Sequence, residues 1–344
     1  MDMGRGGFRR EGCGPPVPEE NTMTRSQQNQ QTRYIFGPVP SRRLGISLGV
    51  DIIPYKTCSL DCLYCECGRT TELIAERRSF FAPQLLLREL AEVLPAIPRL
   101  DHITFSGSGE PTLNSDLGAF IAAIRQMSRT PLAVLTNGTL LFRQDVRSEL
   151  LGADVVLPSL DAALTASFAR VNQPAPGLDV DRIVAGMEAF RREYAGKIWL
   201  EVFILKGVND GEDDIAALGA ALQRIRPDKV QLNTLDRPPA CPGVESAGFA
   251  QLERIRSLWP WASVEIIKRA GRREEIPAFN SNLENSLLNT IRRRPLTIDD
   301  LTTLTGKDEE ELRRYLEVLE GEKKVRPVIT GGRIFYREWE GSDG

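Results

Sequence analysis

The chain has 344 residues, of which 41% are hydrophobic and 26% are charged, a composition typical of water-soluble globular proteins. Its net charge of −3 gives no overall attraction to nucleic acid, and six cysteines in this length do not indicate a disulfide framework. No run of about 18 apolar residues is present, so no membrane span is predicted. We therefore expect a cytoplasmic protein of two domains, or of one large α/β domain with an appendix.

Composition and hydrophobic pattern divide the chain into four parts. Residues 1–33 are rich in Gly, Arg, Gln and Pro and show no periodicity, which predicts a disordered tail. The other parts are a folded core, a linker and a small second domain, predicted at residues 34–267, 268–282 and 283–340. The core opens with a stretch rich in turn-forming residues, 36–45, that we do not expect to be a strand.

Predicted strands and helices then alternate along the core, which is the pattern of repeated β-α units. The predicted strands are 46–53, 102–105, 131–135, 154–157, 198–205 and 229–232. The predicted helices between them are 83–94, 116–127, 145–151, 180–194 and 212–225. Six such units indicate a partial (β/α)6 barrel of the TIM type.

Three cysteines follow the first predicted strand within eight residues: Cys58, Cys62 and Cys65. Soft thiolates at such close spacing favour zinc or an iron–sulfur cluster. A structural metal site needs four protein ligands, so three would leave one metal position open for chemistry. The alternatives are half of a zinc site or a group of reduced cytosolic thiols without function.

The spacing C-x3-C-x2-C, with Tyr64 just before the third cysteine, resembles the cluster motif of the radical S-adenosylmethionine (SAM) superfamily. The resemblance implies a [4Fe–4S] cluster on the three cysteines, with SAM bound to the fourth iron. It also implies reductive cleavage of SAM to a 5′-deoxyadenosyl radical, with electrons from a small donor of the flavodoxin or ferredoxin type. Tyr64 would then pack on the adenine ring.

The loop after the second predicted strand supports this resemblance. It reads Gly107, Ser108, Gly109 and Glu110, and glycines allow backbone groups to approach a ligand closely. This loop resembles the Gly-Gly-Glu loop of radical SAM enzymes, which implies that its backbone and Glu110 hold the SAM amino group.

Later loops add further candidate SAM contacts at the carboxyl ends of the strands, where barrel ligands gather. The resemblance assigns SAM contacts to polar and backbone groups at Asn137, Ser159, Asp161, Val208 and Asn209. The plainer interpretation of Asn-Gly and Ser-x-Asp is turn formation or helix capping.

Several residues remain as candidates for substrate or catalysis. Arg42 and Arg43 are either solvated or contact an anion, and Asn233 and Arg237 follow the sixth strand at the expected barrel mouth. Cys67 and Cys241 are interpreted as hydrogen-atom donors, ligands of a second centre, or buried thiols, of which the last fits a small apolar side chain best. The substrate class is open among peptide, protein, RNA and small molecule.

The motif order over residues 34–267 resembles the radical SAM branch related to wyosine-type tRNA synthases. Members of that tRNA enzyme group carry a second cysteine set ahead of the first, whereas only Cys13 precedes Cys58 here. We therefore do not transfer the tRNA substrate, and a tRNA-modifying enzyme is an alternative only.

The carboxyl-terminal part predicts three helices, at 283–291, 297–304 and 308–320, followed by a hairpin. This arrangement resembles a winged-helix domain. Acidic and basic side chains alternate along it, which disfavours a phosphate-tracking face. We expect it to contact a protein or peptide or to pack on the barrel; an iron–sulfur or zinc sensor that binds DNA through this domain is the alternative.

Overall fold

The computed structural model describes residues 34–41, 43–97, 100–267 and 283–339. The predicted tail (1–33) and linker (268–282) lie outside the described residues. Within the described ranges, no helix is long and apolar enough to cross a membrane.

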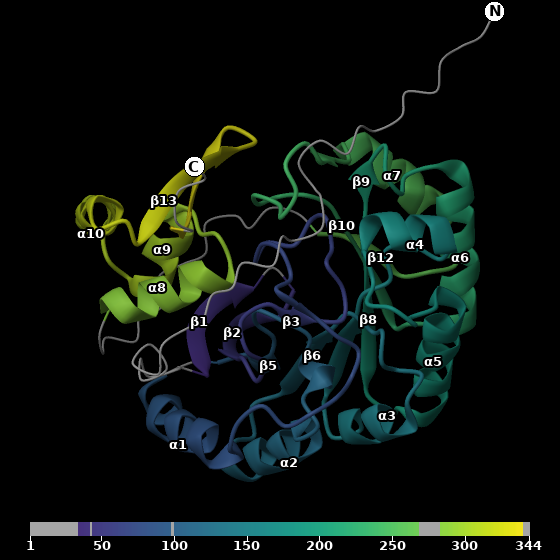
Figure 1. Cartoon of the computed structure of the whole chain (residues 1–344), viewed down its shortest axis with the longest axis horizontal. Helices are drawn as coiled ribbons and strands as arrows, with labels where there is room; N and C mark the ends of the chain where they lie inside the picture. Colours follow the sequence, from purple (N-terminus) through teal and green to yellow (C-terminus); the bar gives the residue numbers. More distant parts are fainter. Residues whose placement is uncertain (1–33, 42, 98–99, 268–282, 340–344) are drawn as a thin grey trace, which may run out of the picture.

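An eight-stranded sheet forms the centre of the molecule, with the strand order β1-β2-β5-β6-β7-β8-β10-β12 (Figure 1). From β2 to β12 each neighbouring pair is parallel, whereas β1 runs antiparallel to β2. The strands are β1 (Ile35–Ser41), β2 (Gly45–Val50), β5 (His102–Phe105), β6 (Leu132–Thr136), β7 (Val155–Pro158), β8 (Lys197–Phe203), β10 (Lys229–Asn233) and β12 (Val264–Ile266). The predicted α/β class and partial barrel are confirmed.

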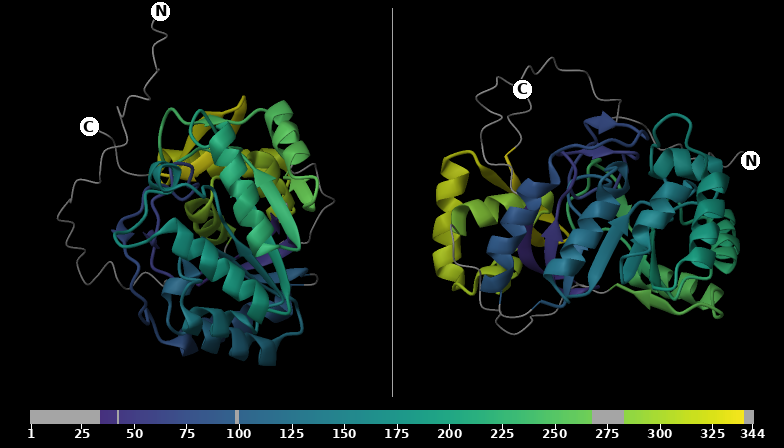
Figure 2. Two further views of the ribbon diagram at one scale, coloured as in Figure 1. Left: turned by 90° about the vertical axis from the view of Figure 1, so that its right-hand side faces the viewer. Right: turned by 90° about the horizontal axis from the view of Figure 1, so that it is seen from below.

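Helices cover the outer face of this curved sheet, as Figures 1 and 2 show. They are α1 (Pro83–Val93), α2 (Leu117–Met127), α3 (Gln144–Leu150), α4 (Thr165–Val171), α5 (Val180–Glu193), α6 (Glu212–Ile225) and α7 (Phe249–Leu258). Outward strand residues such as Phe105 and Val134 pack with helix residues such as Phe120 in the main core. Because strand side chains alternate, the intervening residues, such as Ala133 and Leu157, form a separate cluster on the inner face.

The predicted strands and helices of the core are found within a few residues of their expected bounds, but the expectation for residues 36–45 is wrong. Most of this stretch belongs to the edge strand β1, which tolerates Pro38 and Pro40 because an edge strand need not donate every amide. A register irregularity between Phe36 and Val39 accommodates the turn-forming residues. The short α4, α7 and β12 were not predicted.

The carboxyl-terminal part contains α8 (Leu283–Arg293), α9 (Ile298–Thr305), α10 (Glu309–Gly321), β13 (Val325–Thr330) and β14 (Arg333–Glu338). Thr297 and Asp300 cap α9 reciprocally. The domain shares a hydrophobic cluster with Phe36 and Val39 of β1, and it lies beside β1 in Figure 1. Packing on the barrel is therefore confirmed, whereas the winged-helix identification stays a prediction.

Candidate functional site

The cysteine loop (residues 57–67) follows β2 and begins in β3 (Thr57–Cys58), which pairs with β4 (Glu72–Leu73). Its backbone is fixed at Leu63, whose N–H donates to the Val171 carbonyl at 3.0 Å. Cys58, Cys62, Cys65 and Cys67 are free, half-buried thiols. Among the described residues, no three His, Cys, Asp or Glu side chains converge on a position for a single metal ion; a cluster, which takes one thiolate per iron, needs no such convergence.

Each of the three motif cysteines has its own nitrogen donor, supplied by a different part of the fold. The pairs are Lys56 Nζ with Cys65 Sγ at 3.1 Å, Asn137 Nδ2 with Cys58 Sγ at 3.5 Å, and Asn172 Nδ2 with Cys62 Sγ at 3.4 Å. Hydrogen bonds to cysteine sulfur stabilise the thiolate and tune the potential of a bound cluster. The sequence reasoning missed Lys56 and Asn172, because neither belongs to a motif and the contact of Asn172 depends on where α4 packs.

Burial and neighbouring groups shift the pKa values of Lys56 and of the thiols around it. Lys56 is only 3% exposed, and although burial opposes its charge, the neighbouring thiols raise its pKa above the usual value. Burial raises the pKa of Cys58 to about 12, whereas a hydrogen bond with Cys67 and the nearby Lys56 lower the pKa of Cys65 well below its usual range. A metal ion bound at Cys58 would take the place of the proton that burial favours there.

The glycine loop (residues 107–110) lies against the cysteine loop. A Cβ atom at Gly109 would lie 2.0 Å from the carbonyl oxygen of Thr57, so only glycine permits this approach. Ser108 is 4% exposed and donates both its N–H and its hydroxyl to Asp51 Oδ2, at 3.1 and 2.9 Å. The two loops are therefore held as one unit.

Glu110 is 2% exposed and its carboxylate is engaged by protein groups. Thr112 and Thr136 donate to Oε1 and the Asn137 N–H donates to Oε2 at 2.7 Å. Burial raises the pKa of this carboxyl despite these donors. In this structure Glu110 connects the glycine loop to the end of β6.

Asp161 is buried near Cys62 and accepts three hydrogen bonds. Its Oδ2 accepts hydrogen bonds from Tyr64 Oη at 2.5 Å and Asn172 Nδ2 at 2.7 Å, and its Oδ1 accepts one from the Phe203 N–H at 3.0 Å. The Tyr64 ring stacks on Phe203 with 4.0 Å between centroids. The structure thus gives Tyr64 and Asp161 protein partners in the places where SAM contacts are predicted.

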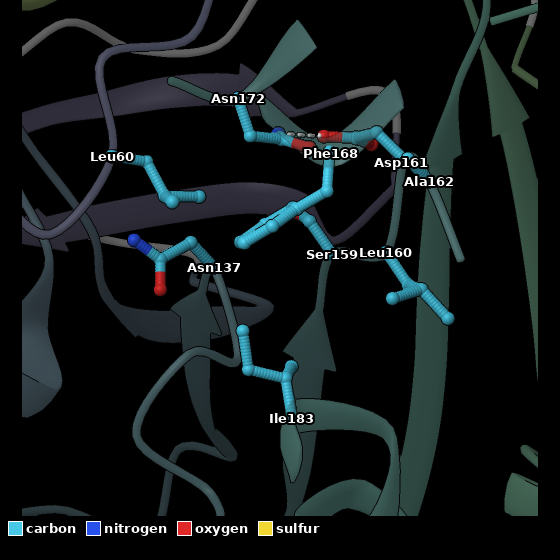
Figure 3. A pocket seen from close by; sticks show the side chains of 9 residues that line it. All are labelled: Leu60, Asn137, Ser159, Leu160, Asp161, Ala162, Phe168, Asn172 and Ile183. Atoms are coloured by element: carbon cyan, nitrogen blue, oxygen red, sulfur yellow. Dashed lines mark hydrogen bonds between the residues drawn. The ribbon is translucent and has the colours of Figure 1, made fainter. Parts of the chain in front are cut away.

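A pocket beside the cysteine loop is lined by Asn137, Ser159, Asp161 and Asn172 together with apolar side chains (Figure 3). Asn172 is 2% exposed, and its Oδ1 has no hydrogen-bond partner among the residues that the structure describes. A buried acceptor without a partner is costly, and this small pocket has room for about one water molecule that could donate to it. The three free thiols with their nitrogen donors fit an iron–sulfur cluster.

The loop after β8 holds the last predicted SAM contacts. Asn209 is fully buried; its amide donates to the carbonyls of Asp161 and Phe203 and accepts from the Leu205 N–H at 2.8 Å. The side chain of Val208 packs in a small apolar cluster with Leu63 and Cys241. Asn209 therefore shapes this loop, and any adenine contact would come from backbone groups.

Arg237 lies in the barrel-mouth loop but contacts the carboxyl-terminal domain. It is 5% exposed; its guanidinium donates to the Pro295 carbonyl and lies 3.2 Å from Asp300 Oδ2 and 3.6 Å from Glu66 Oε2. Cys241 is 1% exposed in the cluster with Val208, but it is disulfide-bonded, so the interpretation of this residue as a free buried thiol is wrong. Cys67 Sγ donates to the Arg293 carbonyl at 2.6 Å.

A polar group on the inner face of the sheet joins the predicted candidates Arg43, Asn233 and Ser159 around Glu201, which the sequence reasoning missed. Glu201 of β8 pairs with Arg43 Nη1 at 2.8 Å and accepts from Asn233 Nδ2 at 2.9 Å. Ser159 Oγ lies 3.5 Å from the same carboxylate. Trp199, Glu201 and Phe203 alternate along β8, and this alternation could have placed Glu201 on the same face of the sheet as the two aromatic side chains.

Residues 52–219 match the Radical SAM superfamily, whose members use a [4Fe–4S] cluster and SAM. The fold and the cysteine loop thus define a protein with a radical SAM domain. The chain is 32% identical over 305 residues to a UPF0026 protein of Methanocaldococcus jannaschii, a match that covers 88% of this chain and 94% of that protein. The chain belongs to the UPF0026 family.

Two further similarities extend this comparison. The chain is 35% identical over 319 residues to a protein named GTPase Obg from Brachyspira hyodysenteriae; the match covers 91% of this chain but only 46% of that longer protein. A solved radical SAM methyltransferase from Sphaerobacter thermophilus is similar with 17% identity and a TM-score of 0.49, covering 65% of this chain and 67% of that one.

Proposed function

We propose that this protein is a radical SAM enzyme that reductively cleaves SAM at a [4Fe–4S] cluster and so modifies a substrate. The observation that carries this proposal is the arrangement of three free thiols, each with its own nitrogen donor from a different element. Cys58, Cys62 and Cys65 would hold the cluster.

Cys58, Cys62 and Cys65 would hold this cluster, which when bound would supply the electron for reductive cleavage of SAM and so the radical chemistry on the substrate. Lys56, Asn137 and Asn172 would donate hydrogen bonds to the thiolates that hold it. The backbone of the glycine loop offers polar groups for the amino acid part of SAM.

The substrate would lie toward the inner face of the sheet, where Arg43, Glu201 and Asn233 form a polar group. Exclusion of water by a bound substrate would protect a reactive radical there from side reactions. The electron would come from a small protein of the flavodoxin or ferredoxin type. A cluster held by thiolates needs reduced cysteines, which the cytoplasm maintains.

The test uses full-length protein reconstituted anaerobically with iron and sulfide and reduced with dithionite. We expect the wild type to bind about four irons and to convert SAM to 5′-deoxyadenosine and methionine. Cys58→Ala should lose both the cluster absorbance and the cleavage. Cys67→Ser, which alters a free thiol of the same loop that is not a proposed ligand, should keep its iron content.

A wild-type protein that holds its cluster and never cleaves SAM, with or without candidate substrates, would refute the proposal. Equal iron loss in Cys58→Ala and Cys67→Ser would refute the ligand assignment.

A further inference from the structure

The glycine loop is fixed by a carboxylate at the end of β2. Asp51 is 5% exposed, and its Oδ2 accepts the N–H and hydroxyl of Ser108. A Cβ atom at Gly107 would lie 2.2 Å from Asp51 Cγ, so the loop backbone lies directly on this carboxylate. The position of Asp51 therefore determines the position of the loop.

The same oxygen is bound by a residue of the carboxyl-terminal domain. Arg293, the last residue of α8, lies with Nε 3.0 Å from Asp51 Oδ2, and the two side chains are 11% and 4% exposed. Its guanidinium also lies over the Phe36 ring, 5.0 Å from the centroid, and its Nη1 donates to the Asn289 carbonyl at 3.0 Å. These contacts fix the guanidinium from three sides.

Cys67 of the cysteine loop makes a second connection between the glycine loop and the end of α8. Its Sγ donates to the Arg293 carbonyl at 2.6 Å and lies 3.7 Å from the Gly107 carbonyl. The end of α8 thus contacts the cysteine loop through its backbone and the glycine loop through Asp51. The barrel residues Phe36 and Val39 anchor the domain nearby by packing with Leu287 and Ile291.

We propose that Arg293 is a positioning residue for SAM, because it holds Asp51 and thereby the glycine loop in the conformation that receives the cofactor. This inference rests on the proposed SAM site. An arginine nitrogen paired with a buried carboxylate fixes that carboxylate, and removal of one partner leaves the other charge buried without it. Docking of the carboxyl-terminal domain and SAM affinity are then coupled.

The experiment compares full-length Arg293→Ala, Arg293→Lys and Arg292→Ala, each anaerobically reconstituted and checked for iron content. Arg292 is the matched control, because it is the preceding arginine of α8 and also contacts the barrel, with its guanidinium 4.9 Å from the Tyr55 ring centroid, but pairs with Glu338 and not with Asp51. SAM affinity is measured by equilibrium dialysis. The electron paramagnetic resonance spectrum of the dithionite-reduced cluster is followed as SAM is added.

We expect Arg293→Ala to keep its iron and to bind SAM about tenfold more weakly, the effect of losing one charged hydrogen bond. The spectral change should then require correspondingly more SAM. Arg293→Lys should recover part of the affinity and Arg292→Ala should match the wild type. The effect of Arg293→Ala should also be absent in an Asp51→Asn background, because the coupling passes through that carboxylate.

Wild-type SAM affinity in Arg293→Ala with full iron content overturns this inference while the proposed function stands. Failure of the wild-type protein itself to bind SAM overturns the proposed function instead. If Arg293→Ala does not fold, Arg293→Lys decides: an affinity equal to the wild type overturns the inference, and a weakened affinity with full iron content supports it.

Discussion

Asp161 gives a prediction whose size follows from the structure. Burial raises the pKa of this carboxyl from 3.8 to about 6, against the hydrogen bonds from Tyr64, Asn172 and the Phe203 N–H. The folded protein therefore holds the Asp161 proton more tightly than the unfolded chain does. This stabilisation is fully present below pH 3.8 and is lost as the pH rises through about 6.

The perturbation is Asp161→Asn, which keeps the size of the side chain and removes the titration. Between pH 5 and pH 7.5 the linkage amounts to about 1.4 kcal/mol of unfolding free energy in the wild type. The amide also has one acceptor in place of two, so at least one buried donor loses its partner, which costs about 1–3 kcal/mol at either pH. The wild type should thus exceed the variant in stability by about 1.4 kcal/mol more at pH 5 than at pH 7.5.

The assay is urea unfolding of metal-free, reduced protein at the two pH values, followed by tryptophan fluorescence. Asp181→Asn, at an exposed position of α5, serves as the control and should differ from the wild type equally at both pH values. A stability difference for Asp161→Asn that does not change with pH would refute the reasoning.

Two further changes test the loops around the thiols. Lys56→Met should lower the midpoint potential of the cluster by on the order of 100 mV, because a buried positive charge beside Cys65 favours the reduced, more negative cluster. A redox titration that finds the same midpoint potential for Lys56→Met and Lys56→Arg would contradict this. Gly109→Ala should destabilise the protein by about 2 kcal/mol or more, because the new Cβ meets the Thr57 carbonyl. The control in urea unfolding is Gly248→Ala, whose Cβ would have no neighbour within 4 Å. Equal losses of unfolding free energy in the two variants would contradict the close approach at Gly109.

The parts of the site that the sequence predicted are local in the chain. Cys58, Cys62 and Cys65 fall within eight residues, and the position of the glycine loop follows from the alternation of strands and helices. Lys56 is also local, two residues before Cys58, but it was missed because it belongs to no motif. The contact of Asn172 was not predictable, because it exists only after α4 packs behind the cysteine loop. The same limit explains Glu201, whose partners come from two distant parts of the chain.

Arg237 illustrates how a correct position yields an incomplete interpretation. The sequence placed it at the barrel mouth after the sixth predicted strand, and the structure agrees. Its partners Pro295 and Asp300 lie in the carboxyl-terminal part of the chain, and no pattern near Arg237 indicates where that part packs. These partners depend on long-range packing, which the residues next to Arg237 in the sequence do not indicate.

The strand β1 has a consequence for work with shortened chains. Pro38 and Pro40 have no amide hydrogen, so the backbone of β1 presents an interrupted row of donors that resists extension by a strand of another molecule. Its apolar residues Phe36 and Val39 are nevertheless covered by the carboxyl-terminal domain. A barrel expressed without that part would expose these apolar side chains of β1 to solvent. Low solubility of such a fragment would then result from this exposed apolar surface, even if the barrel itself folds correctly.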